Sequence, residues 1–147
     1  AEKNALVRLK DELQISNVTM LDPVPKNEVG RYISILDLAL INLRKSPLFK
    51  TVIPSKIFEN AGMEIPIIMG VEGEAGDIIE HYGAGMVFEP ENEGDFNAKL
   101  TLLLEDSSLY AKCKEGCRKL ADDFDRRRLA MNMLNVIEDT YCKSLNR

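Results

Sequence analysis

Residues 52–59 have the sequence Val-Ile-Pro-Ser-Lys-Ile-Phe-Glu, and the predicted fold is built around them. Their apolar side chains recur at helical spacing, and Pro54 suits a first helical turn because its missing N–H costs nothing there. Ser55 and Glu59 are four residues apart, so they share one face of the predicted helix. Backbone N–H groups at a helix start attract phosphate, and Lys56 adds a positive charge beside them.

The carboxylate of Glu59 is expected one turn further into the same helix. A carboxylate accepts two hydrogen bonds, which suits the diol of a ribose. One hypothesis is therefore that this helix start holds a nucleoside diphosphate. The alternative is an ordinary capped helix in an α/β domain, and the residues alone leave both open.

The composition limits the classes of protein to which the chain can belong. With 147 residues, 45% of them hydrophobic, the chain can bury one core, so we expect one domain. No apolar run is long enough to span a membrane, and no signal-peptide pattern is present at the N-terminus. A formal net charge of −5 argues against a nucleic-acid-binding protein, which would usually carry a basic face.

Cysteine and histidine are too sparse for a metal site. Cys113 and Cys117 lie one helical turn apart without a second pair, which argues against zinc and favours reduced thiols in a cytoplasm. His81 alone cannot complete a metal site or a catalytic triad, so we expect it at the surface or at a helix end. The acidic residues of 89–95 lack the spacing of an EF-hand and are expected to form a loop surface. We therefore expect neither a metal nor a cofactor.

Predicted strands alternate with predicted helices along the chain. Strands are expected at 17–21, 37–43, 66–71 and 83–88. Helices are expected at 4–13, 27–35, from 54 onward, at 77–82, 96–104, from 106 or 107 to 122, and at 125–144. The last helix is expected to bury a stripe formed by Leu129, Met133, Leu134, Ile137 and Tyr141.

This alternation predicts an α/β fold with a parallel sheet and flanking helices. Ligands of such sheets bind beyond the carboxyl ends of the strands. The loop after Leu43 and the start of the helix at residue 54 both belong to that end.

Several segments together resemble the C-terminal domain of B-type retaining glycosyltransferases, more narrowly family 4, the group 1 enzymes of polysaccharide and lipopolysaccharide assembly. The segments are Asn-Val-Thr-Met-Leu at 17–21, Val-Pro at 24–25, Asp-Leu-Ala-Leu at 37–40, Pro-Ser-Lys-Ile-Phe-Glu at 54–59 and Ile-Pro-Ile-Ile at 65–68. Gly-Ala-Gly-Met-Val at 83–87, Pro90 and Phe-Asp-Arg at 124–126 are typical of the end of that domain. The resemblance covers residues 5 to 140, and its 54–59 motif is the most specific part.

The resemblance implies a Rossmann-like domain that binds a nucleoside diphosphate sugar of the UDP or GDP type. It assigns the ribose to Glu59, the diphosphate to the helix start at Ser55 and Lys56, and the nucleobase to the loop at Val24 and Pro25. The loop 46–51, with Thr51, would face the donor sugar, and Gly73 and Asp77 would border the site. It assigns no catalytic residue.

The whole enzyme that the resemblance implies would transfer a sugar from this donor to a glycan or lipid-linked acceptor. The acceptor would be bound by a preceding N-terminal domain. The enzyme would be cytoplasmic, with peripheral attachment to the inner face of the membrane. Two alternatives stay open: a nucleotide-sugar 2-epimerase, and a non-catalytic nucleotide-binding or protein-interaction domain.

The sequence departs from the family pattern at three points. Thr51 stands where the family has the first of two glutamates, and Glu64 stands where it has a glycine, so the helix is expected to end through Gly62. The N-terminal domain and the first two strands of the C-terminal domain are not in the sequence, which is therefore interpreted as a single partial, Rossmann-like domain at 1–147. We expect this fragment to be inactive alone.

The missing strands leave a gap in the predicted sheet. In the order 3-2-1-4-5-6, residues 17–21 would be strand three and 38–43 strand four, with the two missing strands between them. Either strand three pairs directly with strand four, giving a four-stranded sheet, or a second molecule fills the gap. We favour a homodimer because the first helix and strand would otherwise lack apolar cover.

Overall fold

The computed structural model describes residues 3–145 and contains a parallel sheet with helices on both faces. Its strands are β1 (Ala39–Asn42), β2 (Ile67–Gly70) and β3 (Gly85–Val87), in the order β1-β2-β3. Ile68 of the central strand pairs with Leu40 on one side and with Met86 on the other. The prediction of a Rossmann-like α/β fold with flanking helices is confirmed.

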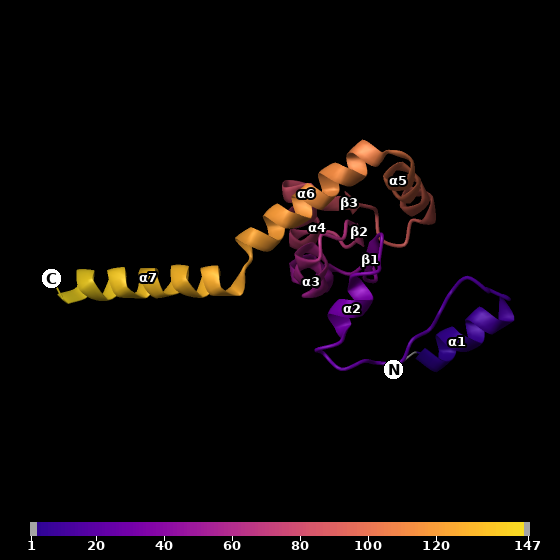
Figure 1. Ribbon diagram of the computed structural model, residues 1–147, viewed down its shortest axis with the longest axis horizontal. Helices are drawn as coiled ribbons and strands as arrows, with labels where there is room; N and C mark the ends of the chain where they lie inside the picture. Colours follow the sequence, from indigo (N-terminus) through magenta and orange to yellow (C-terminus); the bar gives the residue numbers. More distant parts are fainter. Residues whose placement is uncertain (1–2, 146–147) are drawn as a thin grey trace.

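The α-helices follow the predicted order with small differences at their ends, and a 3-10 helix forms within the segment 46–51 that was predicted as a loop (Figure 1). They are α1 (Lys3–Glu12), α2 (Val29–Ile33), the 3-10 helix η1 (Pro47–Thr51), α3 (Lys56–Gly62), α4 (Glu74–Tyr82), α5 (Glu93–Glu105), α6 (Ser107–Asp123) and α7 (Arg126–Leu145). The side chains of Asn92 and Asp106 cap α5 and α6 by accepting hydrogen bonds from the backbone N–H groups of Asp95 and Leu109. His81 lies exposed in the last turn of α4, as predicted.

Strand β2 is buried on both faces, which explains its uninterrupted apolar sequence. Ile67 and Met69 face a core cluster that α3, α4 and α6 complete with Ile57, Ile79 and Leu120. On the other face, Ile68 packs with Phe88, Leu103 and Cys113. The sheet therefore holds the loops at its carboxyl edge on a rigid base.

Helix α6 lies against the end of α4 and against the sheet. A Cβ added at Gly116 would come within 2.4 Å of the carbonyl oxygens of Tyr82 and Gly83, so only glycine allows this approach. The Cys117 Sγ lies 3.2 Å from the Ala84 carbonyl oxygen, and burial raises the pKa of this thiol to about 12. Cys117 is thus a packing residue.

Gly62 is the last residue of α3, but it does not cap the helix as expected, because the C-cap is Met63. Glu64, which stands where the resembled family has a glycine, adopts a left-handed conformation with φ 55°. Glycine adopts this conformation at a lower cost in free energy. Its carboxylate accepts hydrogen bonds from Arg118 Nε at 3.2 Å and Nη2 at 2.9 Å. This bidentate pair with α6 fixes the glutamate in place and lowers its pKa.

The strand predicted at 17–21 does not form, and this prediction is wrong. The segment is exposed and irregular, and the sheet of the described residues ends at β1. Lys3 of α1 donates a hydrogen bond to the Leu21 carbonyl oxygen at 2.8 Å and forms an ion pair with Asp22. A short apolar run needs a neighbouring strand to pair with, and β1 does not supply one here. The four-stranded sheet is therefore wrong as well.

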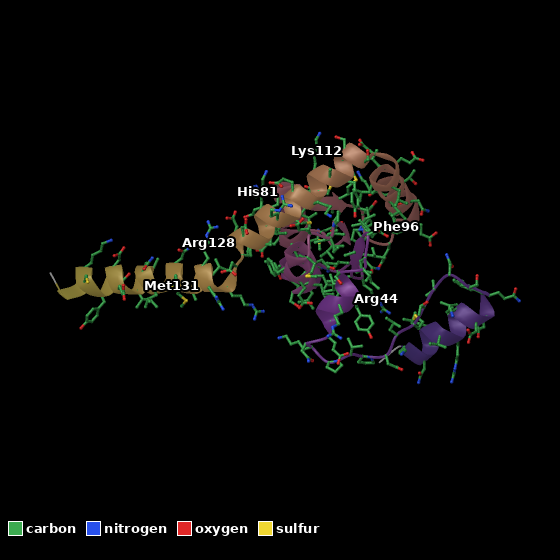
Figure 2. All side chains as sticks on the ribbon, viewed as in Figure 1. Arg44, His81, Phe96, Lys112, Arg128 and Met131 are labelled. Carbon is green, nitrogen blue, oxygen red and sulfur yellow. The ribbon has the colours of Figure 1, made fainter. Side chains whose placement is uncertain are left out.

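The apolar stripe of the last helix is also exposed, contrary to the prediction. Helix α7 extends away from the sheet, while α1 lies apart from it on the opposite side (Figure 1). Leu129 is 44% exposed and Met133 67% exposed. Figure 2 shows the side chains of α7, Met131 among them, standing clear of the core. Amphipathic spacing predicted this helix correctly, but nothing in the described residues covers its apolar face.

Candidate functional site

Three loops leave the carboxyl edge of the sheet, and two of them meet above the end of β2. Lys45, which follows β1, donates its backbone N–H to Glu91 Oε1 at 3.0 Å. Its Nζ donates to Glu89 Oε1 at 2.7 Å, and both glutamates follow β3. The loops after the two outer strands are thus joined across the central one.

The loop after β2 enters the same network through Glu72. Its carboxylate lies 3.0 Å from Lys50 Nζ and 3.9 Å from Lys45 Nζ. The Glu72 side chain is 33% exposed, less than either lysine. Glu72 therefore bridges two cations that come from the loop after β1 and from η1.

The Lys45–Glu89 pair stabilises the charged form of both partners. The hydrogen bond from Lys45 lowers the pKa of Glu89, aided by Asn92 Nδ2, which donates to Glu89 Oε2 at 3.0 Å. In turn, the hydrogen bond to Glu89 raises the pKa of Lys45. The Glu89 backbone N–H also donates to Asp95 Oδ2 at 2.8 Å, which fixes the glutamate relative to α5.

A narrow cleft lies between these loops. Its lining residues are Leu43, Arg44, Lys45, Ser46, Phe49, Lys50, Val71, Glu72 and Pro90. The volume of the cleft is about 10 Å³, which is room for about one water molecule. Arg44, one of the lining residues, is labelled in Figure 2.

Gly73 brings η1 against the start of α4. It has φ 80° and ψ −150°, and an added Cβ would lie 2.3 Å from the Lys50 carbonyl oxygen. The loop 46–51 therefore packs directly on the residue that the resemblance places at the border of the site. Asp77 lies in the first turn of α4, and its backbone N–H donates to the Gly73 carbonyl oxygen at 3.0 Å.

Helix α3 begins at Lys56, so Pro54 precedes the N-cap Ser55 and does not lie in the first helical turn as predicted. The Ser55 carbonyl oxygen accepts from the backbone N–H groups of Phe58 and Glu59, so Ser55 and Glu59 lie one turn apart. The Ser55 side chain makes no capping bond. Within residues 3–145, no protein acceptor binds the backbone N–H of Ser55 or Lys56. Ser55, Lys56 and Glu59 are all exposed.

Buried contacts hold α3 in place. Ile57 is fully buried, and the ring of Phe58 packs against Phe124 with centroids 4.8 Å apart. Asn60 Nδ2 donates to the Lys56 carbonyl oxygen at 2.7 Å. The polar face of α3 is therefore presented by a helix whose other face is locked into the core.

None of the predicted donor-binding residues lines the cleft, and this includes Ser55, Lys56 and Glu59. Val24 is half-buried and Pro25 exposed in the segment before α2, and neither lines the cleft. Thr51 ends η1, where its Oγ1 donates to the Leu48 carbonyl oxygen at 3.3 Å. The structure thus places Ser55, Lys56 and Glu59 at the start of α3, and Val24 and Pro25 in the segment before α2.

The roles of Lys45, Glu72 and Glu89 were not predicted from the sequence. Glu89 and Glu91 lie exposed in a loop, as predicted for the acidic run at 89–95, and they also bind the loop after β1. One signal was available, because these three residues each follow shortly after a predicted strand. Parallel strands bring their carboxyl ends to one edge, so such residues converge.

Two features are absent from the part of the chain that the structure describes. No group of three or more His, Cys, Asp or Glu side chains in this part is arranged to hold a metal ion. None of its helices combines the length and the apolar character needed to cross a bilayer.

One family model matches most of this chain, and two solved structures share its fold. The family model described as "Glycosyl transferases group 1" matches residues 1–120. No curated protein matches the chain in sequence.

Two solved structures share the fold with a TM-score of 0.72 each. One is sucrose-phosphate synthase from Thermosynechococcus elongatus, at 13% identity, with 97% of this chain and 35% of that chain covered. The other is a glycosyltransferase from Rickettsia africae ESF-5, at 18% identity, with 92% and 35% covered. The chain therefore spans about a third of the length of either protein, and at these identities the likeness concerns the fold.

Proposed function

The chain belongs to the group 1 glycosyl transferases, and we propose that it is the donor-binding part of a retaining glycosyltransferase. The donor is a nucleoside diphosphate sugar of the UDP or GDP type, carrying a hexose or an N-acetylhexosamine. The observation that carries the proposal is the family match over residues 1–120, which includes the sheet, its carboxyl edge and α3. In open parallel sheets this edge is where ligands bind.

The diphosphate is proposed to bind at the start of α3. The backbone N–H groups of Ser55 and Lys56 have no protein acceptor in the described chain, and the Lys56 side chain is exposed. Unpaired N–H groups beside a positive charge suit an anionic oxygen. The buried contacts of Ile57 and Phe58 support this role because they fix the helix without using its polar face.

The ribose and the sugar are proposed to lie on either side of that diphosphate. Glu59 shares the exposed face of α3 with Ser55 and can accept two hydrogen bonds from a ribose diol. Thr51 belongs to the loop 46–51 on the sugar side, where it supplies a hydroxyl in place of a carboxylate. The base is proposed to contact Val24 and Pro25.

Catalysis in the whole enzyme is proposed to rest on stabilising the departing diphosphate. Helix N-terminal N–H groups and cations stabilise developing negative charge without reorganising. The acceptor is a glycan or a lipid-linked sugar bound by a separate domain, in polysaccharide or lipopolysaccharide assembly. The enzyme is proposed to act in the cytoplasm, peripheral to the inner face of the membrane.

A titration of the chain with uridine diphosphate and with guanosine diphosphate, monitored by NMR, tests this proposal. We expect binding by the wild-type chain, with Glu59→Ala losing roughly tenfold or more, because a hydrogen bond to a charged group contributes about 1.5–3 kcal/mol. Glu80→Ala is the matched control, since Glu80 is an exposed helical glutamate on α4. Absence of binding by the wild-type chain refutes the proposed function, and equal affinities of the two variants refute the ribose assignment.

A further inference from the structure

An aromatic contact joins α3 to the junction between α6 and α7. The rings of Phe58 and Phe124 lie with their centroids 4.8 Å apart and their planes inclined by 31°. Phe124 is the C-cap residue of α6, and α7 begins at Arg126. Both rings are partly buried and pack against the core cluster that contains Ile57. The helix that carries Glu59 is thus in direct contact with the end of α6.

Phe124 is itself held by contacts from two other helices. The edge of the Tyr82 ring meets it, with centroids 6.1 Å apart. The Tyr82 hydroxyl donates to Asp123 Oδ2 at 2.9 Å, and Asp123 Oδ1 lies 3.2 Å from Arg128 Nη1. Because these contacts come from α4 and α7, the ring of Phe124 is a fixed support for Phe58.

Phe58 shares a helical turn with Glu59. The backbone N–H groups of both residues donate to the Ser55 carbonyl oxygen, at 3.1 and 3.3 Å. The Glu59 side chain is exposed, and no ion pair or hydrogen bond to its carboxylate is present within residues 3–145. The orientation of α3 therefore decides where this carboxylate lies. The groups of a binding site have to be held within about 0.5 Å of their productive positions.

We infer that Phe124 is a positioning residue of the proposed donor site, where it acts through Phe58 on the placement of Glu59. The inference rests on the proposed function and adds a residue that lies outside the range 1–120 matched by the family model. Without the Phe124 ring, α3 can adopt other orientations. The apparent affinity then falls in proportion to the fraction of molecules that keep the competent orientation.

Nucleotide affinities of three variants test the inference, with whichever of uridine diphosphate and guanosine diphosphate the wild-type chain binds. Phe124→Leu keeps an apolar side chain but removes the ring contact, so binding should weaken about threefold or more. Phe124→Tyr keeps the ring and should restore the affinity to within about twofold of the wild-type value. Urea unfolding of each variant identifies the conditions in which it is folded, and the titrations are made there.

Phe96→Leu is the matched control. Phe96 is also partly buried and pairs with Phe88, with centroids 5.2 Å apart, but in the other core cluster. Phe96 and Arg128 are labelled on opposite sides of the core in Figure 2. This variant loses an aromatic contact of the same kind away from α3, so it should bind the nucleotide as tightly as the wild-type chain.

A double-mutant cycle shows whether Phe124 acts through Phe58. Phe58→Leu should weaken binding by about the same factor as Phe124→Leu, and the double variant should lose no more than either one. Two independent losses of about threefold would instead multiply to about ninefold. A residue that only stabilises the fold would not show this coupling in the affinity.

The outcomes distinguish the inference from its premise. If the wild-type chain binds neither diphosphate, the proposed function fails and the inference fails with it. If the wild-type chain binds, the inference alone is overturned by a Phe124→Leu variant of unchanged affinity, or by a Phe96→Leu variant that is weakened as much. It is overturned as well if the losses at Phe58 and Phe124 multiply.

Discussion

Replacement of Gly73 by alanine should strain the backbone where η1 packs on this residue, and it should lower the stability of the fold. With φ 80° and ψ −150°, Gly73 occupies a region that is essentially restricted to glycine, so alanine should cost roughly 1–3 kcal/mol in backbone strain. The new Cβ would also lie 2.3 Å from the Lys50 carbonyl oxygen, and overpacking of this kind costs a further 1–3 kcal/mol or so. We expect the free energy of unfolding to fall by roughly 2–5 kcal/mol.

Gly83 is the matched control for this substitution. It also has a positive φ, 61°, but no atom lies within 4 Å of the position that an added Cβ would take, so Gly83→Ala should cost only about 1–2 kcal/mol. Urea unfolding followed by far-UV circular dichroism measures both variants against the wild-type chain. Equal losses of unfolding free energy would refute the close packing of Lys50 on Gly73, and with it the placement of the loop 46–51 in the site.

Three other predictions follow from particular contacts. The buried Cys117 thiol, with its pKa raised to about 12, should react with a thiol reagent at pH 8 far more slowly than the exposed Cys142, and similar rates by mass spectrometry would contradict the packing of α6. The chain alone should transfer no sugar, because the acceptor is proposed to bind to a separate domain and positioning of the two substrates supplies a large share of catalysis; turnover by the purified chain would disprove this. Sedimentation should show a dimer that Leu40→Lys, on the open edge of β1, converts to a monomer, and a wild-type monomer at high concentration would rule the dimer out.

The elements that pack against other described residues were predictable from the sequence. The apolar run of β2 has helices on both faces, and the helical spacing around Ile57 matches a helix that packs on the sheet. The run at 17–21 and the stripe of α7 carry equally clear patterns, yet neither is covered by the part of the chain that the structure describes. A local pattern predicts that a segment can pair or pack, but its partner decides whether it does.

The candidate site was predictable to a different extent. The helix start at Ser55 and Lys56 depends on a short stretch of sequence, and the spacing of one turn between Ser55 and Glu59 is as expected. The contacts of Lys45 with Glu89 and Glu91 join residues more than forty positions apart, so they require the register of the sheet. The fold had to be known before these residues could be recognised as neighbours.

The site combines a buried base with charged side chains that are partly exposed. Ile57 and Ile67 are fully buried, whereas the ion pairs of Lys45, Lys50 and Glu72 join side chains that are between 33% and 56% exposed. Exposed ion pairs contribute little to stability and exchange readily with other polar partners. Removing the charge of Lys45, Lys50 or Glu72 should therefore leave the unfolding transition in place, whereas Ile57→Ala should lower stability by roughly 2–5 kcal/mol. The stability of the fold then depends on the buried base, so the charged residues of the cleft can be replaced without unfolding the chain.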